Sequence, residues 1–435
     1  MYKNKLLLLV LALIIFAQFT NSQNNTNSPY TRFGYGDISD TNNGEQRAMG
    51  GVSIGSRSNT SINTVNPASY SSVDSLSFMF DVGTSALISH FSEQTGAKTA
   101  FNANLEYITM RFRLSRLFGF SAGVLPYSST GYNFYKYDST YIKNTLNSVQ
   151  KLDTIHYTKS FAGTGGFSQV YMGLSAKITK HLSVGANVYY IYGTINNYRD
   201  VSFNGTSVDP LTSTSTTIRG TISANNLKYR FGAQYYNTFN DKHSISVGII
   251  YEPKVRLNGG FSQITVGIIN DTIDSRHPKS NYIKYGFDLP TLYGIGINYT
   301  YNNRYTFGMD YSMQEWKNAE FFSKTDSLKN RSKLALGFEY QPNPTGRKLS
   351  DHMRYRAGFN VSDSYYNVYG VTQPKNYSIT CGLGLPLYDR RTNTMSMLNA
   401  SFEYGKIGSA ALSENYYKFT LNIAFNEHWF MKRKL

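Results

Sequence analysis

The chain has 435 residues, of which only 16% are charged, and a formal net charge of +16. Charged residues make up roughly a quarter of an ordinary globular domain, so this composition argues against a soluble enzyme. Lys and Arg are scattered along the chain rather than clustered, which argues against nucleic acid as a partner. We attribute the positive charge to solvated loops and interior side chains. Attraction to anionic lipid head groups is the alternative.

The N-terminus has the pattern of a secretory signal peptide. Lys3 and Lys5 precede an unbroken apolar run from Leu6 to Ala17, which at about a dozen residues is too short for a comfortable membrane-spanning helix. The small residue Ser22 suits cleavage directly after it. We therefore predict that residues 1–22 are a signal peptide, with a retained anchor helix as the alternative. The expected location of the mature chain is the bacterial outer membrane.

Export without long apolar segments predicts a β-barrel. Cys381 is the only cysteine, so no internal disulfide can stabilise the exported chain. After Ala17 no segment approaches the roughly 18–20 consecutive apolar residues of a spanning helix. Lipid offers no partner to an open strand edge, so such a chain can cross a bilayer only as a closed barrel. The 37 Tyr and 27 Phe suit the aromatic girdles of a barrel.

Residues 23–75 differ from everything that follows them. They are rich in Asn, Ser, Thr and Gly, show weak periodicity, and contain the turn-rich pieces Phe33–Gly36, Met49–Gly51 and Val65–Ser69. Such a composition predicts compact irregular structure rather than strand or long helix. From Leu76 onward, a period of two takes over.

Apolar residues alternate with small or polar ones through the rest of the chain. The clearest alternations run over Leu76–Val82, Phe101–Tyr107, Val184–Tyr190, Leu227–Tyr235, Ile245–Tyr251, Tyr305–Met313, Leu334–Tyr340, Tyr355–Val361, Tyr377–Leu385 and Tyr417–Phe425. A soluble sandwich shows the same alternation, but the signal peptide, the strand lengths and the aromatic strand ends favour lipid-facing strands. Counting weaker candidates as well, residues 76–435 are predicted to form an all-β, transmembrane antiparallel barrel of about fourteen strands, to within two. The polar stretches 137–165, 193–216 and 258–285 are expected to be outward loops.

No motif predicts chemistry, so we assign no catalytic residue, cofactor or metal. Gly51–Gly55 matches the nucleophile elbow around Ser53, but no helix pattern follows it, as that motif requires. Gly163–Gly166 lacks the Gly-Lys-Ser/Thr ending of a phosphate loop. The histidines, at positions 90, 156, 181, 243, 277, 352 and 428, are too dispersed for a zinc site. Cys381 is expected to be buried filler on an apolar face rather than a reactive thiol, and an integral-membrane hydrolase is only a third alternative.

Several short motifs occur in the order found in one family of outer-membrane proteins. Arg47–Val52 leads to Asn66-Pro67-Ala68, Asp288–Gly296 contains "Pro, two residues, Gly-x-Gly", Asp310-Tyr311 is followed by Glu315-Trp316, and Leu336–Asn343 precedes Arg354–Phe359. Over residues 45–72 and 285–390 the chain thus resembles the long-chain fatty-acid and aromatic-hydrocarbon outer-membrane transporters (FadL/TodX type). Its overall style resembles outer-membrane proteins of the Bacteroidetes type.

The resemblance implies a fourteen-stranded barrel closed by an N-terminal hatch over residues 23–75. Gly50, Gly51, Asn66, Pro67 and Ala68 would be structural residues of that hatch. The implied function is passive uptake of hydrophobic small molecules, long-chain fatty acids or aromatic hydrocarbons, through a hatch-gated apolar pocket whose residues cannot be assigned. The implied partners are outer-membrane lipid and the hydrophobic ligand.

The alternative is a non-transport barrel that serves as subunit or scaffold of a secretion or outer-membrane assembly complex, with protein partners. The two functions predict different interiors. A transporter requires a continuous apolar cavity beneath the hatch, whereas a polar lumen counts against transport.

Overall fold

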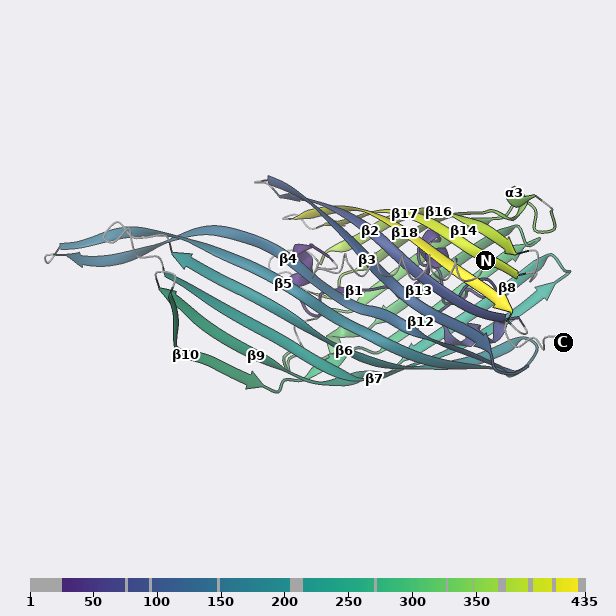
Figure 1. Ribbon diagram of the computed structural model, residues 1–435, viewed down its shortest axis with the longest axis horizontal. Helices are drawn as coiled ribbons and strands as arrows, with labels where there is room; N and C mark the ends of the chain where they lie inside the picture. Colours follow the sequence, from purple (N-terminus) through teal and green to yellow (C-terminus); the bar gives the residue numbers. More distant parts are fainter. Residues whose placement is uncertain are drawn as a thin grey trace, which may run out of the picture.

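The computed structural model contains a closed, fourteen-stranded antiparallel barrel, so the predicted fold class is confirmed (Figure 1). The structure describes residues 26–74, 77–93, 96–146, 149–203, 214–269, 272–325, 328–346, 348–366, 373–389, 394–408 and 412–428. The predicted signal peptide lies outside these residues. The wall strands are β2 (Ser77–Glu93), β3 (Gly96–Arg113), β4 (Phe118–Leu146), β5 (Val149–Lys177), β6 (Leu182–Phe203), β7 (Thr214–Phe239), β8 (His243–Glu252), β12 (Leu292–Tyr301), β13 (Tyr305–Gln314), β14 (Arg331–Tyr340), β15 (Arg354–Asp363), β16 (Lys375–Asp389), β17 (Thr394–Gly408) and β18 (Ser413–His428).

The barrel closes because its first and last strands pair along most of their length. The register runs from Ser413 opposite Ser92 to His428 opposite Ser77. Short turns join the strands at one end, for example at residues 302–304, and longer excursions join them at the other. Barrels of the outer membrane have short periplasmic turns, so we call the end with the long excursions the outer end.

Four wall strands continue far beyond the others at the outer end. The first part of β7 pairs with β9 (Val255–Ile269), which pairs in turn with β10 (Thr272–Ile283), whereas the second part of β7 pairs with β8. A sheet made from β4 to β7, β9 and β10 thus projects from one side of the barrel (Figure 1). The three stretches expected to be loops therefore lie at the outer end but consist largely of strand. Their Thr, Tyr and Ile content suits extended backbone, and hairpin pairing continues past the membrane band.

Outward positions of the wall form an apolar band. On β12 the outward side chains are Tyr293, Ile295 and Ile297, all exposed, while Gly294 and Gly296 alternate with them on the inner face. Other wall strands repeat the pattern, with exposed Phe231 on β7, Phe307 on β13 and Leu421 on β18. Exposed apolar side chains over a closed wall suit hydrocarbon rather than water. Separately, none of the helices within the described ranges is both long and apolar enough to cross a membrane.

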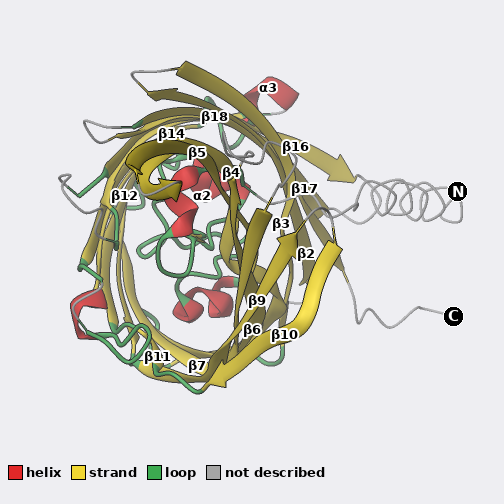
Figure 2. Ribbon diagram, turned by 90° about the vertical axis from the view of Figure 1, so that its left-hand side faces the viewer, coloured by secondary structure: helices red, strands yellow, loops and turns green. Residues whose placement is uncertain are grey.

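Residues 26–74, which precede β2, lie inside the barrel (Figure 2). They contain the short elements η1 (Pro29–Arg32), β1 (Asp37–Ile38), α2 (Gly44–Ala48) and η2 (Pro67–Ser72), and we call residues 26–74 the hatch. α2 begins at a capping box in which the Asn43 and Gln46 side chains each accept a backbone N–H of the other residue. The hatch starts near the outer end, where the Tyr30 hydroxyl donates to the Leu412 carbonyl at 2.5 Å, and it ends beside the start of β2. The remaining short elements are β11 (Phe287–Leu289), η3 (Trp316–Asn318) and α3 (Leu349–His352).

Candidate functional site: the hatch-filled lumen

Inward glycines of the wall receive the hatch backbone. A Cβ at Gly337 of β14 would lie 2.6 Å from the Met49 carbonyl oxygen, and one at Gly185 of β6 would lie 2.5 Å from the Pro67 carbonyl carbon. Gly119, Gly248, Gly296 and Gly358 also meet hatch backbone, whereas Gly232 and Gly308 meet hatch side chains. Several of these glycines pair across strands, such as Gly337 with Gly358. The hatch therefore packs directly against the wall, at a separation that leaves no space for side chains.

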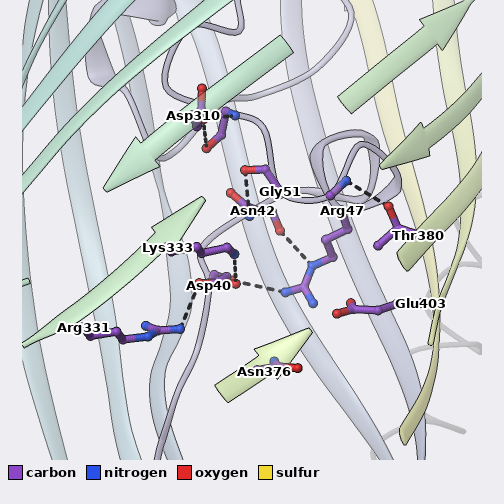
Figure 3. A network of polar contacts seen from close by, with 12 residues as sticks. Asp40, Asn42, Arg47, Gly51, Asp310, Arg331, Lys333, Asn376, Thr380 and Glu403 are labelled. Atoms are coloured by element: carbon purple, nitrogen blue, oxygen red, sulfur yellow. Dashed lines mark hydrogen bonds and ion pairs between the residues drawn. The ribbon is translucent and has the colours of Figure 1, made fainter. Parts of the chain in front are cut away.

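The predicted hatch residues Gly50 and Gly51 form the turn that follows α2. Both have positive φ, +69° and +92°, a region that glycine adopts without steric cost. The Gly50 N–H donates to the Thr380 hydroxyl at 2.9 Å, and that hydroxyl donates to the Ala48 carbonyl at 3.0 Å (Figure 3). The turn is thereby fixed to strand β16.

The predicted triplet Asn66-Pro67-Ala68 forms the start of η2 and is buried. The Asn66 side chain accepts the Ala68 N–H at 3.1 Å and donates to the Ile54 carbonyl at 2.8 Å. Pro67 occupies the first helical position, where a missing N–H has no cost. The triplet therefore links two hatch loops at the point where they meet strands β6 and β7.

Ser53, the centre of the Gly-x-Ser-x-Gly match, is a contact between hatch and wall. The Asp310 carboxylate on β13 accepts the backbone N–H groups of Ser53 and Ile54, each at 2.6 Å (Figure 3). The Ser53 side chain is buried, and its hydroxyl lies 3.4 Å from the same carboxylate. None of the hydrogen bonds that we describe joins Ser53 to a histidine. The arrangement explains the sequence match without a nucleophile.

Charged side chains of the wall point inward and bind the hatch. Arg47 of α2 forms an ion pair with Glu106 of β3 at 2.8 Å, and Lys418 contacts the same carboxylate at 2.6 Å. Arg356 of β15 pairs with Glu339 at 2.6 Å and reaches Glu45 of the hatch at 3.5 Å. Removing one partner of such a buried ion pair is strongly destabilising, because the other charge stays buried without its counter-charge. Sequence reasoning missed these residues, although charges at inward positions of lipid-facing strands were a visible signal.

Asp40 connects the middle of the hatch to strand β14. Its carboxylate lies 2.5 Å from the Lys333 ammonium and 3.8 Å from the Arg331 guanidinium (Figure 3). Removal from bulk water would by itself raise the pKa of the Asp40 carboxyl, but the two cations outweigh that effect and hold the pKa well below its usual range. Asp40 is therefore a charged contact at neutral pH.

Two cavities between hatch and wall, formed by described residues, are small, and charged side chains lie beside apolar ones in their linings. One, of about 110 Å³, is lined by Lys228, Arg230, Glu252 and Lys333 among others. The second, of about 180 Å³, includes Glu106, Glu414 and Lys418 in its lining. Pockets for small molecules usually enclose roughly 300–1,000 Å³ and are mostly apolar. These cavities match a few water molecules better than a fatty acid or an aromatic hydrocarbon.

Aromatic side chains close the outer end of the lumen. The rings of Tyr35 and Trp316 lie 5.6 Å apart, and those of Trp316 and Tyr365 lie 4.6 Å apart. All three side chains are buried, and the Tyr365 hydroxyl donates to the Gly36 carbonyl at 2.6 Å. Burial raises the pKa of Tyr365 well above its usual value. The apolar surface at this end is therefore buried by packing between the hatch and the outer loops.

A seam separates β3 from β4 in the outer half of the wall. The two strands pair only between Ile108–Arg113 and Gly119–Val124. Beyond that point the hatch covers the β4 edge: β1 pairs with Ser128 and Ser129. The Thr31 hydroxyl accepts from the Gly131 N–H at 3.1 Å and lies 3.0 Å from the Gly131 carbonyl oxygen, while the Ser28 carbonyl, at 2.6 Å, is its closest acceptor. The hatch thus acts as an internal strand at the seam. No sequence pattern indicated this arrangement.

Neither Cys381 nor the histidines form a metal site within the described residues. Cys381 is exposed on the outward face of β16, between Ile379 and Leu383. The expectation that it is buried filler was wrong, because the apolar face it occupies is the outer surface of the barrel. Within the residues that the structure describes, no three His, Cys, Asp or Glu side chains come together as a metal site would require.

The fold and the filled lumen define a hatch-plugged outer-membrane-type barrel. The solved structure of a Pseudomonas aeruginosa FadL homologue superposes with a TM-score of 0.58 at 12% identity, covering 90% of this chain and 99% of that one. The Ralstonia pickettii toluene transporter TbuX gives 0.57 at 16% identity, with 89% and 99% covered, and the Pseudomonas putida toluene transporter TodX gives 0.55 at 15%, with 92% and 99% covered. At these identities the similarity establishes a shared fold.

A family model described as BamG matches residues 1–435, so the chain belongs to the BamG family. None of the curated proteins matches the chain in sequence. The structural part of the expected resemblance to FadL/TodX-type barrels is therefore confirmed. The Bacteroidetes-like character, the boundaries at residues 22 and 75, and the hatch role of the five predicted residues stay predictions.

Proposed function

We propose that this chain is a permanently plugged barrel of the bacterial outer membrane that serves as a structural subunit of a secretion or outer-membrane assembly complex. The observation that supports this proposal is the interior: the hatch backbone packs on wall glycines, and the two cavities described between hatch and wall are small and have charged side chains in their linings. Membership of the BamG family favours the same function. Lipid surrounds the barrel, and other proteins are its functional partners.

Extraction of the tagged full-length chain from native membranes in mild detergent tests this proposal. We expect stoichiometric protein partners that stay bound through size-exclusion chromatography. The purified barrel should bind no more radiolabelled palmitate or toluene than an equal amount of detergent micelles. Recovery of the chain alone, together with saturable binding of either compound, would refute the scaffold function.

Uptake of hydrophobic small molecules is the second candidate, because the fold neighbours include proteins named as toluene transporters. The seam between β3 and β4 also favours uptake, because a hydrophobic ligand could pass through the barrel wall into the bilayer where the strand pairing is interrupted. On this hypothesis the hatch must withdraw from Gly131 and Ser129 during transport. A crosslink between hatch and β4, made through cysteines at positions 31 and 131 in a Cys381→Ala background, would abolish uptake of the labelled compound. Unchanged uptake by the crosslinked protein would exclude this route.

A further inference from the structure

We propose that the open edge of β4 beyond the seam, residues 135–141, is a docking site for an extended, acidic segment of a partner protein, which adds there as a further β-strand. The inference rests on the proposed scaffold function and names the place where a partner binds.

The first observation is that the β4 edge already accepts a strand from the hatch. Both the N–H and the C=O of Gly131 point toward the seam, where they meet the Thr31 hydroxyl. Backbone groups alternate with a period of two, and the β4–β5 register is continuous from Ser128 to Leu146. The odd-numbered residues from 133 to 141 therefore present N–H and C=O to the same edge. The contact of the Lys98 ammonium with the Asn133 carbonyl, at 3.5 Å, agrees with that direction.

Beyond Asn133 the edge has no strand against it in the described part of the chain. β3 begins only at Gly96, and its last pairs with β4 lie far below, at Ile108 and Val124. β5 occupies the opposite edge of β4, and β6 covers β5 only as far as Tyr157. The outermost part of the projection is thus a two-stranded ribbon (Figure 1). Ribbons of two strands have marginal stability in water unless a third element covers them.

The side chains beside this edge are tyrosines on one face. Tyr135, Tyr137 and Tyr141 are 64%, 73% and 72% exposed, far beyond the membrane band. The rings of Tyr135 and Tyr137 contact each other edge to face, with centroids 5.3 Å apart. Tyrosine is enriched in protein interfaces because it offers large contact area with little conformational freedom to lose. Neither a proline nor a bulge, two of the devices that protect a strand edge, occurs between Asn133 and Tyr141.

The charge around the edge favours an acidic partner. Lys136 is exposed and lies directly opposite Lys159 across the ladder. Lys159 is paired with Asp138 at 3.2 Å, whereas Lys136 makes no ion pair with a residue that the structure describes. Lys98 stands at the base of the edge and is also exposed. An added strand with acidic side chains would compensate both cations, and its backbone would provide the missing hydrogen bonds.

Residue-resolved hydrogen exchange on the native complex, compared with the chain released from its partners, tests the inference. The amides of Tyr135, Tyr137, Ser139 and Tyr141 should exchange rapidly in the released chain and be protected in the complex. The amides of Lys136, Asp138 and Thr140 point to β5 and should be protected equally in both samples. Protection that is absent from the odd-numbered amides of a complex with stoichiometric partners would overturn this inference and leave the scaffold function intact. Recovery of the chain without any partner would overturn both.

A proline substitution provides an independent measurement. Ser139→Pro removes an edge-facing N–H, which in the chain alone donates to the Asp138 side chain at 3.0 Å. No β4–β5 hydrogen bond is lost, so that ladder should persist, and heat-modifiable migration of the barrel reports its folding. We expect Ser139→Pro to lower the amount of bound partner by about tenfold or more, whereas Ser139→Ala, which keeps the N–H, should lower it less than about twofold. Equal partner recovery with both variants would overturn the inference. Edge protection produced by lipopolysaccharide alone, or a photocrosslink from position 137 to a second copy of the chain, would overturn it too.

Discussion

The packing of the hatch on wall glycines gives a quantitative prediction for Gly358→Ala. A Cβ at position 358 would lie 2.7 Å from the Gly50 Cα and would also meet backbone atoms of Met49, none of which can rotate away. Forcing a methyl group into such a contact typically costs about 1–3 kcal/mol. The added methyl disfavours only the seated hatch, because the same position faces open lumen once the hatch has left. Hatch release should therefore become about 5- to 150-fold more frequent.

Limited trypsin digestion in detergent measures this release. Cleavage after Arg47 requires the hatch to leave the wall, since that side chain is held by Glu106, and cleavage of a transiently opened segment follows the population of its open form. Gly408→Ala is the matched control, because the nearest atom to a Cβ there is 4.0 Å away. Its cleavage rate should equal that of the unmodified protein. If Gly358→Ala were cleaved within about twofold of this control, the contact between hatch and wall backbones would be refuted.

Three further perturbations address the polar contacts of the hatch. Arg356→Met should lower the free energy of unfolding by up to about 3–5 kcal/mol in urea titrations, because the buried Glu339 loses its closest cation and keeps only Arg354 at 3.7 Å. Lys375→Met, at an exposed ion pair, should lower it by less than about 1 kcal/mol. Asp310→Ala should accelerate trypsin cleavage of the hatch, since each of two backbone N–H groups loses its acceptor at about 1–3 kcal/mol; an unchanged rate would contradict the role assigned to that carboxylate. The lowered pKa of Asp40 contributes stability above the ordinary carboxyl range, so hatch protection should decline as pH falls below about 4, and Asp40→Asn should reduce that decline.

The sequence predicts the wall of this protein well because the wall follows one repeating physical rule. Lipid on one side and the lumen on the other impose a period of two, which is visible in segments such as Leu334–Tyr340 and Tyr417–Phe425. The number of strands followed from counting those segments and agrees with the structure. The outer projection could not be separated from loops in the same way. Residues 261–266 of β9, for example, are all half-buried, so the two sides of that segment show no contrast in burial.

The lumen was only partly predictable, because its contacts join residues that are distant in sequence. Asp310 and Ser53 are 257 residues apart, and nothing in either segment indicates the other. The inward glycines were visible as small residues between apolar ones, yet their role depends on which backbone lies opposite. The Ser53 match shows the reverse case, in which a local pattern suggests chemistry that the spatial surroundings exclude. The hatch motif around Gly50 was identified through family resemblance rather than through any physical periodicity.

The contacts of the hatch decide what kind of signal could ever displace it. Moving it away from the wall would separate Arg47 from Glu106 and Glu45 from Arg356, and would leave the Asp310 carboxylate without its two donors. A ligand shifts such an equilibrium only through its preference for the open state, and an apolar molecule offers no groups that replace ion pairs or carboxylate hydrogen bonds. A protein that binds the outer projection leaves all of these contacts in place. A charged, filled lumen beside an unpaired strand edge therefore favours a barrel that acts through its exterior.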